Sequence, residues 1–215
     1  MLNVLKSDSY PEKDTKKGVL REYVEAILIA VILALFIRTF VVQAFKIPSG
    51  SMEPTLLIGD HILVNKFIYG IRIPFVSEPI ISIKQPKRGD IIVFKFPEDP
   101  NKDFIKRIIG LPGDLLMIKD KKIFINNRPF NDPYGMYSDP FIMPKSIRPR
   151  DNFGPMKIPP HSFFVMGDNR DHSYDSRFWG VVDFSAIRGK AFIIYWSWDK
   201  ERFDVRWNRL GKILH

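Results

Sequence analysis

Residues 45–60 read FKIPSGSMEPTLLIGD and directly follow an apolar segment of membrane-spanning length. Pro48 and Pro54 fix their own φ angles and favour extended conformations in the residues before them, so the path between them is stiff and non-helical. Gly50 allows the backbone to approach another group closely. A serine nucleophile needs this arrangement, with Ser51 on a rigid turn and hydrogen-bond donors nearby for an oxyanion. An ordinary Pro/Gly/Ser loop is the alternative.

The apolar segment before this turn indicates a membrane helix. Residues 26–37 are apolar without interruption, and residues 23–45 contain only four polar side chains. At about 1.5 Å per residue this stretch spans roughly 34 Å, compared with about 30 Å of bilayer hydrocarbon. Arg38 lies near the far end, where it can extend to the head groups. We therefore predict a transmembrane signal-anchor helix over residues 23–44; a buried core helix is the alternative.

Charge sets the expected orientation. The lysines and arginine in residues 1–22 precede the apolar segment, so we expect a cytoplasmic tail there and an extracytoplasmic domain over residues 45–215. The net charge of +9 indicates an anionic partner, which for an anchored protein is phospholipid and not nucleic acid. Because the chain has no cysteine, a disulfide framework, a thiolate zinc site and a cysteine nucleophile are excluded.

The rest of the chain has the pattern of strands. A Gly-Asp pair precedes an apolar, β-branched run at residues 59–64, 89–94 and 113–118, which predicts a turn followed by a strand each time. Residues 120–122 suggest a hairpin. Residues 129–160 contain eight prolines and little periodicity, so we expect a long surface excursion there. The predicted fold is mainly β, with antiparallel sheets after one N-terminal transmembrane helix.

A serine nucleophile needs a base, and Lys106 is the best candidate. In residues 103–114, DFIKRIIGLPGD, strand alternation places Lys106 on the same face as Phe104 and Ile108. An apolar setting disfavours the ammonium and lowers the lysine pKa from about 10.4 towards the 7–8 of a working base. Arg107 cannot serve, because a guanidinium does not deprotonate in proteins. A solvated edge-strand lysine is the alternative.

A third charged segment, residues 167–180, reads GDNRDHSYDSRFWG. It lacks the central glycine and terminal glutamate of an EF-hand calcium loop. Asp175 and Arg177 can share one face if the chain is extended there. His172 offers a rival to Lys106, because a serine, a histidine and a nearby aspartate can form a catalytic triad.

These three segments resemble the conserved boxes of the bacterial type I signal peptidases, with PSGSMEPTL at 48–56 as the nucleophile box. The resemblance implies that Ser51 is the nucleophile, that Lys106 is its general base, and that Ser49 joins the Ser51 N–H in the oxyanion hole. It further implies a hydrogen bond from Ser173 to Lys106, and an Asp175–Arg177 pair that supports the loop. Phe104 departs from the tyrosine of many relatives.

The resemblance also implies what the protein acts on. The substrates are signal peptides of exported preproteins, which bind as an added strand with Ala-x-Ala-like ends in shallow apolar pockets. The residues implied for these pockets are Phe45, Ile47, Met52, Leu56, Ile62 and Ile105. No metal or cofactor is implied, and the location is the bacterial plasma membrane, with the secretion translocon nearby. A non-catalytic membrane-anchored scaffold is the alternative, and it would have no reason to desolvate Lys106. A Ser-Lys self-cleaving repressor is disfavoured by the anchor and by the lack of an evident DNA-reading element.

Overall fold

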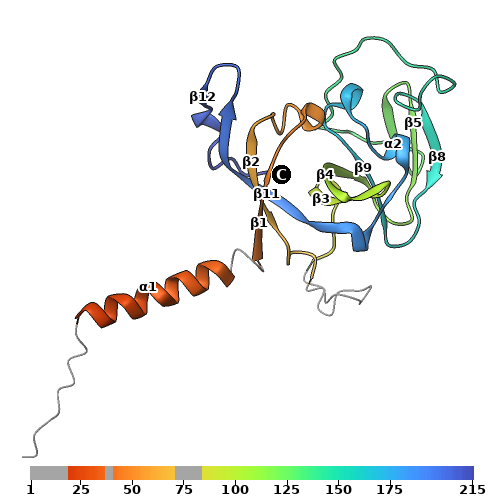
Figure 1. Ribbon diagram of the computed structural model, residues 1–215. Helices are drawn as coiled ribbons and strands as arrows, with labels where there is room; N and C mark the ends of the chain where they lie inside the picture. Colours follow the sequence, from red (N-terminus) through yellow and green to blue (C-terminus); the bar gives the residue numbers. More distant parts are fainter. Residues whose placement is uncertain (1–18, 37–40, 71–83) are drawn as a thin grey trace, which may run out of the picture. The chain divides into compact units, whose positions relative to one another are not determined.

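The structure is a computed structural model that describes residues 19–36, 41–70 and 84–215 (Figure 1). The chain divides into two compact units, residues 1–38 and residues 39–215. The first unit contains helix α1, Val19–Phe36. The second contains all the strands.

Helix α1 is apolar over most of its length. Its charged residues, Arg21, Glu22 and Glu25, lie in the first two turns, where Arg21 Nε donates to Glu25 Oε1 at 2.8 Å. Its apolar side chains are exposed around the whole helix: Val19, Tyr23, Val24, Ile27, Leu28, Ile29, Val31, Ile32, Leu33, Leu35 and Phe36. Within the described ranges, no helix reaches the length and apolar character needed to cross a membrane.

The expected helix over residues 23–44 is wrong at its C-terminal end. The described part of α1 ends at Phe36, residues 37–40 lie outside the described part of the chain, and Val42–Lys46 forms strand β1. β1 pairs with β2 from Val42 opposite Asn65 to Lys46 opposite His61. An apolar run in the sequence does not distinguish a helix from a strand, and here the hydrogen-bonded ladder with β2 stabilises the strand. Most of the predicted tail, residues 1–18, also lies outside the described ranges.

The strands form two antiparallel sheets, as expected. The larger runs in the order β1–β2–β11–β3–β4–β9–β10, with β12 also paired to β11. Its further strands are β2 (Asp60–Asn65), β3 (Ile91–Phe96), β4 (Asp99–Gly110), β9 (Ser162–Met166), β10 (Val182–Asp183), β11 (Ile187–Asp199) and β12 (Asp204–Val205). The smaller runs in the order β7–β6–β5–β8, with β5 at Leu115–Lys119, β6 at Lys122–Ile125, β7 at Arg128–Pro129 and β8 at Phe153–Lys157. Every pairing between these strands is antiparallel.

The expected hairpin forms between β5 and β6, with Asp120 and Lys121 at positive φ angles of 50° and 67°. The Pro-rich excursion contains one regular element that the sequence did not indicate. β8 lies inside it and pairs with β5. Helix α2 (Ser176–Trp179) and the 3₁₀ turns η2 (Gly50–Met52), η3 (Arg170–His172), η4 (Phe184–Ala186) and η5 (Trp207–Arg209) complete the domain.

The three Gly-Asp turns share one construction. Gly59, Gly89 and Gly113 have φ angles of 92°, 94° and 84°, a region that favours glycine. In each turn the aspartate carboxylate accepts from the backbone N–H three residues earlier, at 2.8–2.9 Å: Leu57 to Asp60, Lys87 to Asp90 and Leu111 to Asp114. Each aspartate also pairs with a cation: Arg209, Lys190 and Arg88 respectively. The predicted turns therefore connect the local chain to segments that are distant in the sequence.

The core has three apolar clusters, and β3 separates two of them. Ile91 and Val93 belong to the first, whereas Ile92 and Phe94 belong to the second. β4 lies beside β3, with Lys106 opposite Ile92. Lys106 therefore emerges from the centre of the sheet, where it is surrounded by packed side chains.

Candidate active site

The turn that carries Ser51 is fixed by its neighbours in sequence. Glu53 N–H donates to Gly50 O at 3.1 Å, which closes the single turn of η2, and Leu56 N–H donates to Met52 O at 2.9 Å. The side chains of Met52 and Leu56 are completely buried in the first core cluster. Met52 and Leu56, which lie on either side of Pro54, thus attach a polar turn to the core.

A second segment clamps the turn from the other side. Asn169 donates through its backbone N–H to Ser51 O, and through Nδ2 to Gly50 O, both at 3.2 Å. Gly167 makes this approach possible, because a Cβ at this position would collide with Ser51 O and Ser173 Oγ. The first and third sequence boxes therefore meet at Ser51.

Strand β4 brings Lys106 to the serine. Ser51 Oγ and Lys106 Nζ are 2.7 Å apart, and Nζ is also 3.0 Å from Ile105 O. The Lys106 side chain is only 4% exposed, and burial lowers its pKa from 10.5 to about 8, although the charges of Asp175 and Asp168 partly oppose this. A lysine with this pKa is partly neutral near physiological pH, and a neutral amine can accept the Ser51 proton.

The next residue, Arg107, forms a buried ion pair. Its Nε and Nη2 donate to Asp168 Oδ1 and Oδ2 at 2.8 and 2.7 Å, and both side chains are 0% exposed. Asp168 also accepts from Thr55 Oγ1 at 2.6 Å, and the Tyr134 ring lies 3.6 Å from the guanidinium carbon. Asp168 thus connects β4 to the segment after Ser51. The sequence analysis missed this role, and the only local sign was a carboxylate directly after Gly167.

Asp175 and Arg177 pair as the sequence predicted. Arg177 Nε and Nη2 donate to the two Asp175 oxygens at 2.8 and 2.9 Å, and Asp175 Oδ2 also accepts from Gly167 N–H at 3.1 Å. Burial would raise the pKa of the Asp175 carboxyl, but the adjacent Arg177 charge and hydrogen bonds hold it below its usual value. The pair therefore remains ionised and supports the loop that clamps Ser51.

Ser173 does not make the bond that was expected. Its hydroxyl is buried and, in the part of the chain that the structure describes, has no hydrogen-bond partner of normal geometry. The atoms within hydrogen-bonding distance of Lys106 Nζ are Ser51 Oγ and Ile105 O. The nearby Ser173 hydroxyl instead helps to keep the pKa of Asp175 low.

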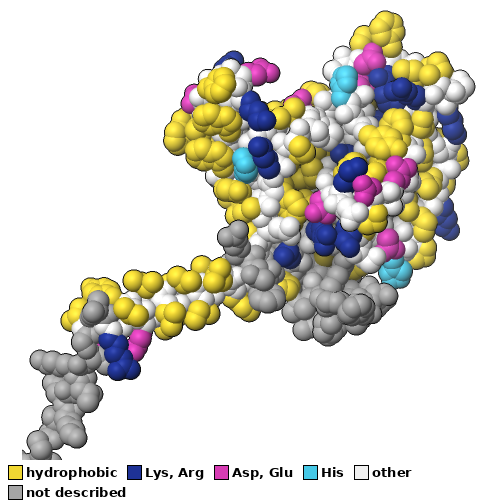
Figure 2. Space-filling model, in the orientation of Figure 1, with side chains coloured by type: hydrophobic (Ala, Val, Ile, Leu, Met, Phe, Trp, Pro, Cys, Tyr) yellow, Lys and Arg dark blue, Asp and Glu magenta, His cyan; other side chains and the backbone are white. Residues whose placement is uncertain are grey.

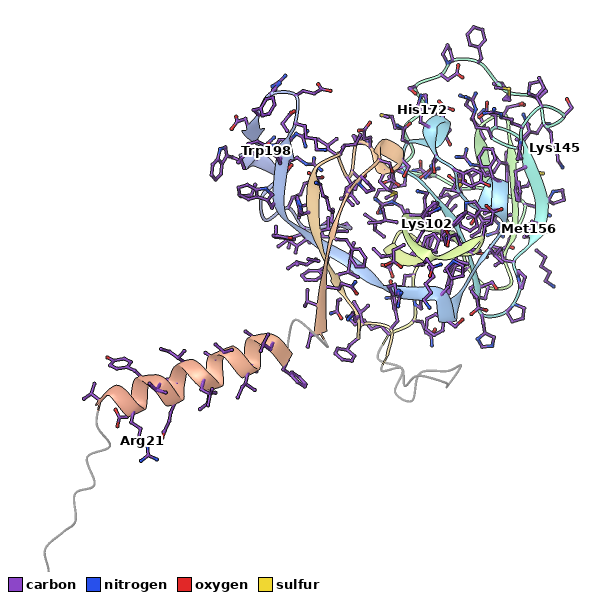
Figure 3. The ribbon with its side chains drawn as sticks, in the orientation of Figure 1. Arg21, Lys102, Lys145, Met156, His172 and Trp198 are labelled. Carbon is purple, nitrogen blue, oxygen red and sulfur yellow. The ribbon has the colours of Figure 1, made fainter. Side chains whose placement is uncertain are left out.

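An open cavity of about 520 Å³ lies over the Ser51–Lys106 pair. It is lined by Ser49, Gly50, Ser51, Glu53, Ile58, Phe104, Lys106, Asn169, His172 and Tyr174. Ser49 is exposed, has extended backbone angles and makes no side-chain cap bond to η2, so its hydroxyl is available to a ligand. Figure 2 shows a hollow in the upper side of the domain, and Figure 3 labels His172 at the upper edge of the domain.

The residues expected to line substrate pockets belong to the first core cluster or pack against it, and their role in substrate binding stays a prediction. Ile47, Met52, Leu56 and Ile62 are buried in the first core cluster, and Phe45 and Ile105 are packed against it. None of these six is among the residues that line the cavity over Ser51. The reason is the hydrophobic effect, because these are the side chains that attach the turn to the core. Apolar walls of the cavity are provided by the exposed side chains of Ile58 and Tyr174 and by the half-buried Phe104.

The described residues of the third segment form neither a catalytic triad with His172 nor a calcium loop. His172 is exposed at the cavity rim and, among the described residues, its side chain makes no hydrogen bond to Ser51. The acids of a possible calcium loop are each paired with a cation: Asp168 with Arg107, Asp171 with Lys121 and Asp175 with Arg177.

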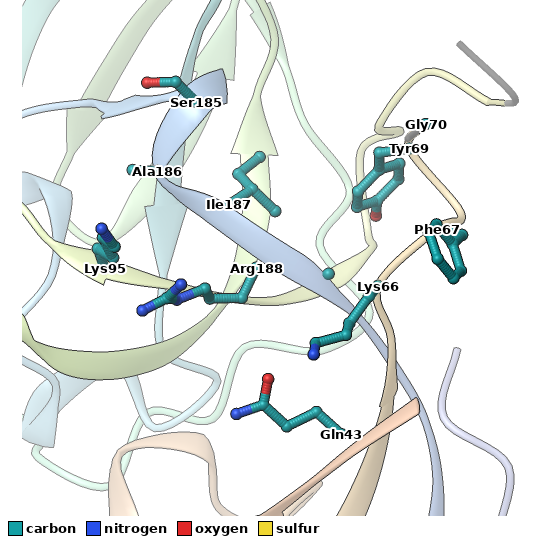
Figure 4. Close-up of a pocket in the computed structure, with 11 residues that line it drawn as sticks. Gln43, Lys66, Phe67, Tyr69, Gly70, Lys95, Ser185, Ala186, Ile187 and Arg188 are labelled. Atoms are coloured by element: carbon teal, nitrogen blue, oxygen red, sulfur yellow. The ribbon is translucent and has the colours of Figure 1, made fainter. Parts of the chain in front are cut away.

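A separate hollow of about 390 Å³ lies between β1, β11 and the segment after β2 (Figure 4). Its lining includes the cationic side chains of Lys66, Lys95 and Arg188. The Ser185 hydroxyl at its edge donates to Asp183 Oδ1 at 2.5 Å. Ser51 and Lys106 are not among its lining residues, and the candidate chemistry therefore lies in the first cavity.

Comparison with known proteins identifies a family for this chain. The family model for signal peptidases, "Signal peptidase, peptidase S26", matches residues 20–196. This chain belongs to that family. It is 36% identical to signal peptidase I of Pseudomonas fluorescens, with 94% of this chain and 82% of the relative covered. It is 40% identical to signal peptidase I of Leptolyngbya laminosa, with 95% of this chain and 88% of the relative covered. Membership of the signal peptidase family makes the protein a peptidase and confirms the sequence resemblance.

Proposed function

We propose that this signal peptidase cleaves signal peptides from exported preproteins by acyl transfer to Ser51, with Lys106 as general base. The observation that carries the proposal is the 2.7 Å separation of Ser51 Oγ from the buried Lys106 Nζ, whose pKa is lowered to about 8. Neutral Lys106 takes the Ser51 proton while Oγ attacks the substrate carbonyl. The resulting ammonium then protonates the leaving amine, and the amine so regenerated activates the water that hydrolyses the acyl-enzyme.

The tetrahedral intermediate needs donors for its oxyanion. Ser49 Oγ and the Ser51 backbone N–H are the proposed pair, since Ser49 lines the cavity beside Ser51. One such donor typically contributes a factor of about 10²–10³ in kcat. The Asp175–Arg177 pair is proposed to act through position, because it holds the segment that contacts the Ser51 backbone.

The peptide is proposed to bind as an added strand. The outer edge of β1 is available, since β1 lies at the end of the larger sheet. On β4, the edge opposite β3 pairs with β9 only from Arg107 onwards, which leaves residues 103–106 open. A strand placed there would bring its carbonyl carbon to Ser51. Phe104, Tyr174 and Ile58 are the apolar side chains of this cavity, and they are proposed to contact the small residues of Ala-x-Ala ends.

The proposed location is the bacterial plasma membrane. Helix α1 exposes apolar side chains on all sides, and the apolar sequence continues to residue 37. We propose that this segment is a single-pass anchor with a cytoplasmic N-terminus, and that the catalytic domain lies outside near the translocon. Signal peptides would then reach Ser51 as they leave the bilayer.

The direct test is cleavage of a peptide with an Ala-x-Ala end by the full-length protein in detergent. We expect cleavage after the last alanine, and none by Ser51→Ala. Trapping the acyl-enzyme on Ser51 by mass spectrometry would identify the nucleophile. A well-folded wild-type protein that binds but never cleaves such peptides would favour the scaffold alternative.

A further inference from the structure

A second hollow, of about 260 Å³, adjoins the catalytic cavity. His172 and Tyr174 line both hollows, so the two meet at these side chains. Its other walls include Arg148, Arg150 and Phe178. Arg148 and Arg150 belong to the Pro-rich excursion, which no step of the proposed chemistry uses. Figure 3 shows His172 on the upper rim of the domain.

The sheet topology directs a bound peptide towards this hollow. β1, β2, β11, β3 and β4 are successive antiparallel neighbours, so β1 and β4 run in the same direction. The free edge of β4 ends at Lys106, because β9 occupies it from Arg107 onwards. An added strand must therefore leave the sheet beside Lys106. The segment it meets there is residues 167–173, which ends at the second hollow.

The direction of the bound peptide decides which of its ends continues from the sheet towards the second hollow. Residues before the cleaved bond belong to the signal peptide, whose apolar part lies in the bilayer in the proposed function. The start of β1, at Val42, follows α1 after only a few residues. The signal-peptide side is therefore expected near the start of β1. The residues after the cleaved bond then continue past Lys106 to His172 and Tyr174.

The charges around the second hollow favour an acidic ligand. Asp171 is already paired with Lys121 Nζ at 2.7 Å, and Arg150 with Asp139 and Asp151 at 2.8 and 2.7 Å. Arg148 is exposed and, within the described ranges, its guanidinium forms no ion pair. An unpaired guanidinium at the wall of a hollow matches a carboxylate.

We propose that this hollow is an exit subsite, which binds the first residues after the cleaved bond, and that Arg148 favours an acidic side chain among them. The inference rests on the proposed peptidase function. It assigns to Arg148 a role in substrate selectivity, and to the Pro-rich excursion the role of a wall of the substrate groove.

The test uses the full-length protein in detergent and a series of peptides that are identical up to the cleaved bond. Glu, Gln or Lys is placed at each of the first four positions after the bond. At one or more positions, we expect kcat/KM to be about two- to fivefold higher for Glu than for Gln, the range of a solvent-accessible ion pair. The preference should shrink as salt rises, because exposed charges are screened over about 8–10 Å.

The decisive variant is Arg148→Glu, which should reverse the preference so that Lys exceeds Glu. Arg128→Glu is the matched control, because this exposed arginine in β7 makes the same change in net charge outside both hollows. The control should keep the preference for Glu, and thermal unfolding should show both variants folded. An unchanged preference in Arg148→Glu, or an equal reversal in Arg128→Glu, would overturn the subsite.

The neutral Gln peptides separate this inference from the function on which it rests. If wild-type protein cleaves them but shows no preference at any of the four positions, the exit subsite is wrong and the peptidase function stands. If none of the peptides is cleaved, the proposed function fails and the subsite fails with it.

Discussion

Lys106 and Arg107 are adjacent buried cations on opposite faces of β4, but their surroundings differ. Arg107 has a carboxylate against its guanidinium, with two hydrogen bonds to Asp168. Among the described residues, Lys106 has no carboxylate within hydrogen-bonding distance; its Nζ contacts Ser51 Oγ and Ile105 O. Burial beside a counter-ion leaves a charge in place, whereas burial beside neutral groups lowers the pKa of a lysine. The Arg107–Asp168 pair therefore stabilises the fold, whereas Lys106 can exchange a proton.

The largest expected effect comes from removing the proton-accepting site. Lys106→Met should abolish cleavage, because in the described part of the chain Lys106 is the group hydrogen-bonded to Ser51 Oγ that can take its proton. Lys106→Arg should not restore activity, since a guanidinium keeps its charge. Single-turnover assays on purified proteins would measure both, with circular dichroism as the check on folding. Measurable cleavage by folded Lys106→Met protein would mean that another base serves Ser51.

The oxyanion site should show the next largest effect on rate. Ser49→Ala is expected to lower kcat by about 10²–10³-fold with little change in KM, because the hydroxyl is proposed to act in the transition state. Ser49→Thr retains a hydroxyl and should lose much less. Steady-state kinetics on both variants measures this difference. Equal decreases in kcat for the two variants would indicate that packing at position 49, and not the hydroxyl, is what matters.

Replacement of Arg107 should lower the free energy of unfolding. Arg107→Met leaves the Asp168 carboxylate buried without its partner, which typically costs about 3–5 kcal/mol. Arg188→Met is the matched control, because Arg188 pairs with Asp103 at 3.3 Å at the surface and should cost less than about 1 kcal/mol. Urea unfolding of both variants measures the difference. Similar losses would contradict the distinction between the buried and the exposed pair.

The pH dependence should distinguish lysine from histidine as the base. The Lys106 pKa of about 8 predicts that kcat/KM rises with pH and levels off above about pH 8, because only the neutral amine accepts a proton. Each pH unit below the pKa should lower the rate about tenfold. A profile of kcat/KM between pH 5 and 10 is the measurement. A midpoint near 6.5, the usual imidazole value, would indicate histidine.

The smallest effect is expected at His172. His172→Asn should retain most of the activity and leave the pH profile unchanged, because this exposed side chain lies at the rim and Ser51 is already bonded to Lys106. The same assays used for Lys106→Met provide the comparison. Loss of cleavage as complete as in Ser51→Ala would restore the triad hypothesis.

The sequence by itself determined the features that follow local rules. The turn around Ser51, the three Gly-Asp turns, the β5–β6 hairpin and the antiparallel strands depend on proline, on glycine at positive φ and on short-range alternation. Strand alternation made Lys106 a candidate base for Ser51, and the resemblance to the signal peptidases implied both that role and the pairing of Asp175 with Arg177.

Only the tertiary structure decided what depends on distant contacts. It placed Val42 in a sheet, because the ladder with β2 outweighs the local apolar pattern. It packed Met52 and Leu56 into the first core cluster and, among the described residues, left Ser173 without the bond to Lys106. Asp168 acquired its role from Arg107, 61 positions earlier in the chain. The physical reason is that desolvation and pairing of a buried charge depend on groups brought together by folding.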